Sequence, residues 1–109
     1  MATYVQEGAA INYWPSVAVT AGDVVVLADL VGVAKRDIAA GALGALHVEG
    51  VFEMDKDTTS GSAIAAGETV YWDAGNEVVT ETSGGNTLLG KAVASSADSD
   101  AAVLVRLSQ

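Results

Sequence analysis

The chain has 109 residues, half of them hydrophobic and 17% charged, which predicts one folded domain rather than a disordered chain. Its formal net charge is −9 and only five residues are Lys or Arg, which argues against a nucleic-acid partner because phosphates require clustered cations. The absence of Cys excludes disulfides, and no apolar run approaches the roughly 20 residues of a membrane span, so we expect no membrane insertion.

The first 16 residues are predicted to form an N-terminal arm, and residues 17–109 a single β domain. The arm carries apolar and aromatic side chains without the period of a strand or a helix. Such side chains dock either on their own domain or on a neighbouring subunit. The arm residues that we predict to form an interface are Tyr4, Val5, Ile11, Tyr13 and Trp14.

A short sequence pattern, in which an apolar residue is followed by Ala-Gly and a second apolar run, recurs along the domain. It occupies residues 19–27, 38–46 and 64–72. Glycine accepts a positive φ without a Cβ clash, and the Val, Tyr and Trp that follow favour strands. We therefore predict tight structural turns at Gly22, Gly41 and Gly67, where one sheet folds back on another. Three copies of this pattern in a small domain indicate a structural role rather than a catalytic or ligand-binding site.

Short strands are predicted between these turns. Residues 46–54 alternate apolar and polar side chains and give the clearest single strand. Further strands are expected at 24–27, 30–34, 69–72, 77–82, 88–94 and 101–107, and a short helix over 34–40 is an open alternative. Strands separated by turns at roughly 8–12 residues are typical of an all-β sandwich or barrel, which is the fold class that we predict.

Residues 85–92 come close to a nucleotide-binding P-loop. They match Gly-x-x-x-x-Gly-Lys, but Ala92 stands where a hydroxyl must bind Mg²⁺, and the residues that follow favour a strand rather than a helix. We therefore favour a Gly-rich hairpin that leads into a strand. A nucleotide-binding, recombinase-like protein is the disfavoured alternative.

No other cluster supports chemistry. Residues 55–61 resemble a calcium loop only faintly, because the Gly comes one position late and Ala66 stands where a Glu is required. His47 is the only histidine, and one histidine supplies neither a zinc site nor a Ser-His-Asp triad. We predict no catalytic, metal-binding or cofactor-binding residues, and the acidic surface fits either solubility or a basic protein partner.

Taken in order, several segments resemble the phage capsid cement, or decoration, proteins. The resemblance covers nearly the whole chain and departs at Ala42, where the family commonly has an acidic residue. The segments that carry it include Tyr4-Val5-Gln6-Glu7-Gly8, Ala21-Gly22-Asp23-Val24-Val25, Glu49-Gly50-Val51-Phe52-Glu53, Gly67-Glu68-Thr69-Val70-Tyr71-Trp72-Asp73, Leu89-Gly90-Lys91-Ala92 and Val103-Leu104-Val105-Arg106-Leu107.

The resemblance implies a non-enzymatic structural protein on the outer capsid surface of a bacteriophage virion, assembled in the cytoplasm of the bacterial host. Its expected partner is the major capsid protein, whose neighbouring subunits it would clamp. We expect a homo-oligomer, with a trimer favoured over a dimer, in which the arm contacts the capsid or another subunit. The alternative is a small β-module that binds another protein or a ligand and has no relation to capsids.

Overall fold

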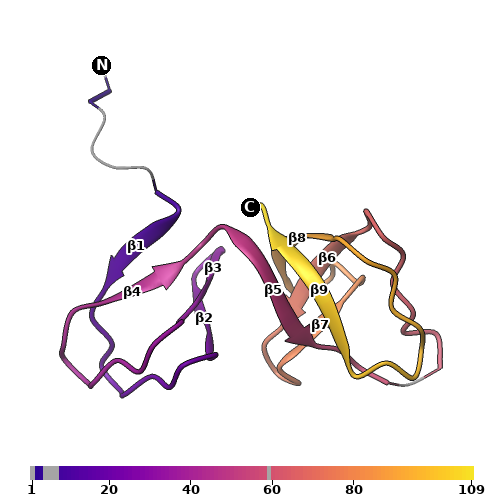
Figure 1. Ribbon diagram of the computed structural model, residues 1–109, viewed down its shortest axis with the longest axis horizontal. Coiled ribbons are helices and arrows are strands. Elements are labelled where there is room, and N and C mark those ends of the chain that lie inside the picture. Colours follow the sequence, from indigo (N-terminus) through magenta and orange to yellow (C-terminus); the bar gives the residue numbers. More distant parts are fainter. Residues whose placement is uncertain (1, 4–7, 59) are drawn as a thin grey trace.

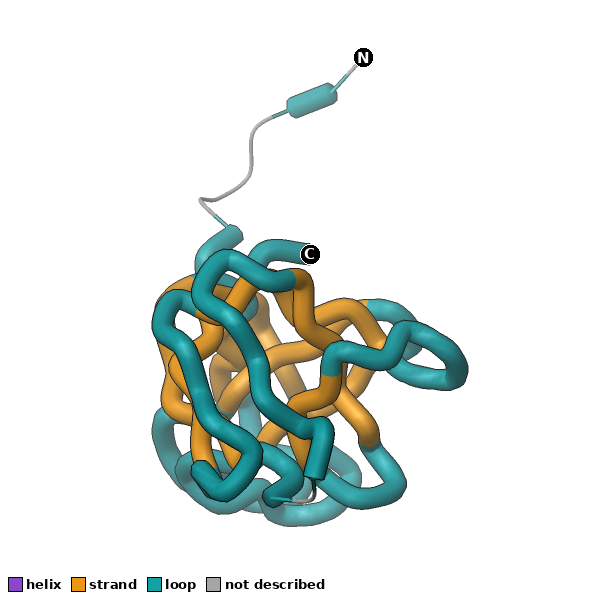
Figure 2. Tube along the Cα trace, turned by 90° about the vertical axis from the view of Figure 1, so that its right-hand side faces the viewer, coloured by secondary structure: helices purple, strands orange, loops and turns teal. Residues whose placement is uncertain are grey.

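The computed structural model describes residues 2–3, 8–58 and 60–109. These residues form strands, turns and loops without a helix (Figure 2), and none of them forms a helix that could cross a membrane. The strands are β1 (Ala10–Tyr13), β2 (Val24–Leu27), β3 (Leu30–Val33), β4 (Gly44–His47), β5 (Gly50–Asp55), β6 (Thr69–Asp73), β7 (Val78–Thr80), β8 (Thr87–Ala92) and β9 (Ala102–Leu107).

Two antiparallel sheets lie side by side (Figure 1). The first sheet has the strand order β1-β4-β3-β2, and the second has the order β5-β9-β8-β6-β7. The prediction of an all-β, sandwich-like fold is therefore confirmed. The expected short helix over residues 34–40 is wrong, because Ile38 is extended and forms an antiparallel bridge with Val19.

The single strand predicted over residues 46–54 is two strands that belong to different sheets. β4 ends at His47 and β5 begins at Gly50, whose φ of 116° turns the chain from the first sheet into the second. Figure 1 shows this crossing between the sheets. Leu46 and Met54 are both buried, so the alternation continues through the bend. A pattern of period 2 thus locates inward-facing residues but does not reveal where a strand changes sheet.

The two sheets repeat one topology. In the first sheet, β1, β4, β3 and β2 lie in the same order as β5, β9, β8 and β6 in the second. β7 is the extra strand, added as a hairpin partner of β6 at the sheet edge.

The turns before these strands repeat as well. Val19 bridges to Ile38 in the first half, and Ile64 bridges to Ser96 in the second. The backbone N–H groups of Gly22 and Gly67, at φ 93° and 86°, donate at 2.6 and 2.7 Å to the carbonyls of Ala34, just after β3, and Ala92, the last residue of β8.

Besides the Gly-rich turn at 83–86, four turns close with the same backbone hydrogen bond, from the N–H of the fourth residue to the carbonyl of the first. They span residues 20–23, 39–42, 65–68 and 97–100, and their N···O distances are 3.0, 3.0, 3.2 and 3.0 Å. The third residue of the second turn, Gly41, has φ 75°. In the fourth turn, Asp98-Ser99 takes the place of the Ala-Gly pair.

The main hydrophobic core joins the two sheets. Val31 and Val33 of β3 pack with buried residues of the second sheet, among them Trp72. A smaller cluster of Ala34, Ile38 and Leu46 packs with partly buried residues of β1 and β2. The first sheet is therefore covered on both faces by hydrophobic clusters. Both clusters lie beneath the surface groups that the next subsection describes.

Candidate functional site

The predicted interface residues of the arm differ in what they contact. Tyr4 and Val5 lie outside the described residues. Ile11 and Tyr13 belong to β1, which pairs with β4, and they pack against the smaller core cluster of their own chain. Trp14, which follows β1, is 60% exposed. Among the described residues of this set, Trp14 is thus the side chain that is available to a partner.

Trp14 belongs to a group of exposed apolar residues that we call the tip patch, defined as Trp14, Val17 and Leu43. Val17 is 74% exposed and Leu43 58%. The segments that carry them are adjacent, because the N–H of Gly41 donates to the carbonyl of Pro15 at 2.7 Å. The sequence did not single out Val17 or Leu43, because both lie in apolar stretches that do not show which side chains stay exposed.

A second exposed apolar group lies on the second sheet. We call it the sheet patch, defined as Val51, Val93 and Leu104, which are 55%, 44% and 40% exposed. Leu104 is paired with Glu53, two residues from Val51, and its carbonyl accepts a hydrogen bond from the N–H of Val93 at 2.9 Å. The tip patch and the sheet patch therefore lie on different sheets.

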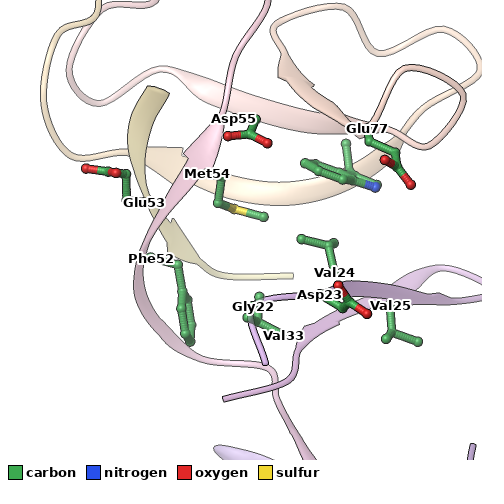
Figure 3. A pocket seen from close by; sticks show the side chains of 11 residues that line it. Gly22, Asp23, Val24, Val25, Val33, Phe52, Glu53, Met54, Asp55 and Glu77 are labelled. Atoms are coloured by element: carbon green, nitrogen blue, oxygen red, sulfur yellow. The ribbon is translucent and has the colours of Figure 1, made fainter. Parts of the chain in front are cut away.

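A groove of about 450 Å³ lies between the sheets (Figure 3). Its apolar lining includes Val24, Val33, Phe52, Met54 and Trp72, and four carboxylates complete the lining: Asp23, Glu53, Asp55 and Glu77. The lining comes from segments far apart in the sequence, which explains why no local motif predicted a groove.

The turn that carries Glu77 is held by Asp73. One carboxylate oxygen of Asp73 accepts hydrogen bonds from the N–H groups of Gly75 and Asn76 at 3.1 and 3.2 Å, and the other accepts from the Asn76 side chain at 2.8 Å. The Asn76 side chain, followed by its backbone N–H, lowers the pKa of Asp73. Glu77 itself has φ 55°, a left-handed conformation that is uncommon for a residue with a Cβ.

Lys56, within the faint calcium-loop pattern, places its own ammonium among oxygen atoms of Asp57, Ser62 and Asp98. Lys56 is 4% exposed, and its ammonium donates to the carbonyls of Asp57, Ser62 and Asp98 and to the Ser62 hydroxyl, at 2.7–3.3 Å. Across the described part of the chain, no group of three or more His, Cys, Asp or Glu could hold a metal ion. No local pattern indicated this role of Lys56, because Ser62 and Asp98 are 6 and 42 residues away in the sequence.

The near P-loop forms a strand. Residues 87–92 are β8, and Gly90 lies so close to β9 that a Cβ would strike the carbonyl oxygen of Arg106. The ammonium of Lys91 donates to the hydroxyl of Thr69 at 2.8 Å. A strand replaces the helix N-terminus that would bind phosphate, so the predicted strand is confirmed. The Gly-rich segment before it is not a hairpin, because β7 and β8 pair with opposite edges of β6 and not with each other.

His47 lies half-buried on β4, opposite Ala10 and Val33. Burial and then the charge of Lys35 lower its pKa, which favours the neutral imidazole. Within the described residues it is not part of a group of three or more His, Cys, Asp or Glu that could hold a metal ion.

Comparison with known protein families identifies one family whose model matches this chain. The model of a family described as phage cement protein matches residues 5–107, which include both sheets and all nine strands of the described chain. Searches of the curated proteins and of the solved structures found no match.

Proposed function

The chain belongs to the phage cement protein family, and from this premise we propose that it binds the outside of the assembled phage head and bridges neighbouring major capsid subunits. A structural role in the virion and association with capsid proteins follow from the family itself. The observation that carries the proposal is the family match over residues 5–107.

Two separate contact surfaces support bridging. A protein that joins two capsid subunits must touch both, and exposed apolar groups mark such surfaces. The tip patch on the first sheet and the sheet patch on the second provide one contact each. We assign the tip patch, with Trp14 as its aromatic anchor, to a capsid or inter-subunit contact, since buried Trp residues often dominate interface energies.

A symmetric homo-oligomer suits the same role, with a trimer favoured and a dimer possible. Identical copies repeat a modest contact at each position on the head, so the combined binding is strong even when each contact is weak. The remainder of the arm, including Tyr4 and Val5, is proposed to extend this contact. Light scattering of the free protein and of protein released from heads would give the oligomer size.

The experiment measures binding of the protein to expanded empty heads by co-sedimentation. One variant lacks residues 1–8, which leaves β1 in place, and another carries Trp14→Ser. We expect either change to weaken binding by about tenfold, as loss of an interface anchor does. Leu88→Ser is the control, because Leu88 is 39% exposed and lies outside both patches.

The possible failures have different meanings. If the unaltered protein does not bind heads, the cement role is overturned. If it binds and both variants bind equally well, the cement role stands, and neither the arm nor the tip patch makes the contact.

A further inference from the structure

The apolar residues at the floor of the groove between the sheets are almost completely buried. Val33, Met54 and Trp72 are only 5–6% exposed, although all three line the groove. In Figure 3, Val24 and Met54 point into the space between the strands. Only a small part of this apolar floor is therefore accessible to a partner from the groove.

Carboxylates surround this floor. Figure 3 shows Asp55 and Glu77 above the space and Asp23 below it, whereas Glu53 points away. Asp23 also accepts a hydrogen bond from the N–H of Thr20 at 2.9 Å. The carboxylates of Asp55 and Glu77 are exposed and have no hydrogen-bond or ion-pair partner within the described residues. The carboxylates of Asp55 and Glu77, at the edge of the groove, are thus free to bind a cation.

The groove contains no positive charge of its own. No Lys or Arg is among the described residues that line it. The ammonium of Lys35 lies outside, over the Phe52 ring at 5.9 Å from its centroid. Like charges around an apolar site repel one another within a Debye length of roughly 8 Å, and a cation brought by a partner relieves that repulsion.

This combination matches one kind of side chain. Lys and Arg have an apolar stem that packs on hydrophobic surface and a charged end that pairs with carboxylates. The ring of Trp72 adds an attraction for the cation, whereas the Phe52 ring already has the ammonium of Lys35 over it. A phosphate backbone would be repelled, and a second copy of this chain would also bring a net charge of −9.

We propose that this groove binds an extended basic segment of the capsid protein, with a Lys or Arg stem on the Met54–Trp72 floor and its charged end at Asp55 and Glu77. This inference rests on the proposed cement function, since it names the chemistry of the partner at one contact. It also makes head binding dependent on salt.

The test compares two double variants that change the net charge equally. The groove variant is Asp55→Asn with Glu77→Gln, and the control is Asp29→Asn with Glu49→Gln, both exposed positions outside the groove. Binding to expanded empty heads is measured at about 50 and about 300 mM salt. We expect the groove variant to bind about tenfold more weakly at low salt, with a smaller difference at high salt, and the control to stay within about twofold.

The groove is also tested without heads. Acetyl-Arg-Leu-Arg-amide is titrated into the protein while the indole resonance of Trp72 and the methyl resonance of Met54 are followed by NMR. We expect shifts that the groove variant and the peptide acetyl-Glu-Leu-Glu-amide both lack. Absence of shifts with the arginine peptide overturns the basic-segment chemistry, whether or not heads bind.

The remaining outcomes are also decisive. If the unaltered protein binds heads and the groove variant binds as the control does, the inference is overturned while the cement function stands. If the groove variant loses self-association but keeps head binding, the groove joins copies of this chain and the inference is again overturned.

Discussion

At the scale of single residues, Gly90 sets how closely two strands approach. A Cβ at this position would strike the carbonyl oxygen of Arg106 and lie 2.7 Å from the backbone nitrogen of Ser108. Backbone atoms cannot move aside as a flexible side chain can. We therefore expect Gly90→Ala to lower the free energy of unfolding by about 2–4 kcal/mol, measured by urea denaturation.

Gly84 is the matched control for this substitution. It lies in the same Gly-rich segment, and an added Cβ would meet nothing within 4 Å. Gly84→Ala should change the free energy of unfolding by no more than about 0.5 kcal/mol. Equal urea midpoints for the two variants would show that Gly90 is not needed for the packing of β8 on β9.

Glu81 gives the molecule a pH dependence. A hydrogen bond to Glu68, followed by repulsion from its charge, raises the pKa of Glu81 above its ordinary value of 4.5. The folded chain then holds this proton more tightly than the unfolded chain does. Its contribution to the free energy of unfolding is present below the ordinary pKa of 4.5 and is lost as the pH rises through the raised pKa.

Replacing Glu81 with Gln removes the charge but keeps the shape. Glu81→Gln should melt at a higher temperature than the unaltered protein at about pH 7, and the difference should disappear near pH 4, where Glu81 is protonated. The measurement is thermal unfolding at both pH values. A difference that is independent of pH would rule out the carboxylate pair as its cause.

At the scale of elements, the four turns differ in one side chain. Asp23, Glu68 and Asp100 each accept a hydrogen bond from the N–H of the first residue of their own turn, at 2.9, 3.3 and 2.9 Å. The fourth residue of the second turn is Ala42, so this turn lacks the contact although its backbone closes at the same distance as the first.

A carboxylate at position 42 should supply the missing contact. We expect Ala42→Asp to raise the free energy of unfolding by about 0.5–1 kcal/mol, because an exposed turn gains one hydrogen bond to an ionised group. Ala40→Asp is the control, since it adds the same charge at the neighbouring exposed position. Equal effects of the two substitutions in chemical denaturation would attribute the change to charge alone.

The sequence predicted those elements that local chemistry determines. Turns with Ala-Gly and runs such as Val24–Leu27 were found because backbone conformation and strand preference act within a few residues. The likeness of the turn at 97–100 to the Ala-Gly turns had no signal in the sequence, because Asp98 and Ser99 replace the recognised pair there. The passage from β4 to β5 was missed because alternation continues through it.

The candidate surfaces were less predictable than the elements. The sequence drew attention to Trp14, and the structure leaves it exposed, but Ile11 and Tyr13 pack on their own chain. The groove and the buried ammonium of Lys56 depend on loops and strands from several parts of the chain. Contacts of this kind have no local pattern, so only the folded structure reveals them.

At the scale of the whole molecule, the two sheets have one topology but are joined asymmetrically. β4 pairs with β3 at a single described position, Val33 with His47, before the chain leaves for the second sheet. The backbone of Val31, two residues earlier, therefore has no strand partner on that side. The side-chain amide of Gln109, which follows β9 of the second sheet, takes the position of the missing strand partner.

This amide connects the two sheets by a pair of hydrogen bonds. The N–H of Val31 donates to Gln109 Oε1 at 2.6 Å, and Gln109 Nε2 donates to the carbonyl of Val31 at 2.7 Å. Because Val31 is fully buried, loss of the amide leaves two polar groups with poor access to water. We expect Gln109→Ala to lower the free energy of unfolding by about 1–3 kcal/mol.

Hydrogen exchange distinguishes this connection from a general loss of stability. The amide of Val31 should exchange faster in Gln109→Ala by a larger factor than the amide of Val105, which lies within the second sheet. Ser108→Ala is the control, because Ser108 bonds to Leu89 through its backbone N–H, which the substitution retains. Equal acceleration at Val31 and Val105 would mean that the sheets separate only on global unfolding, and that the Gln109 amide does not hold the first sheet against the second.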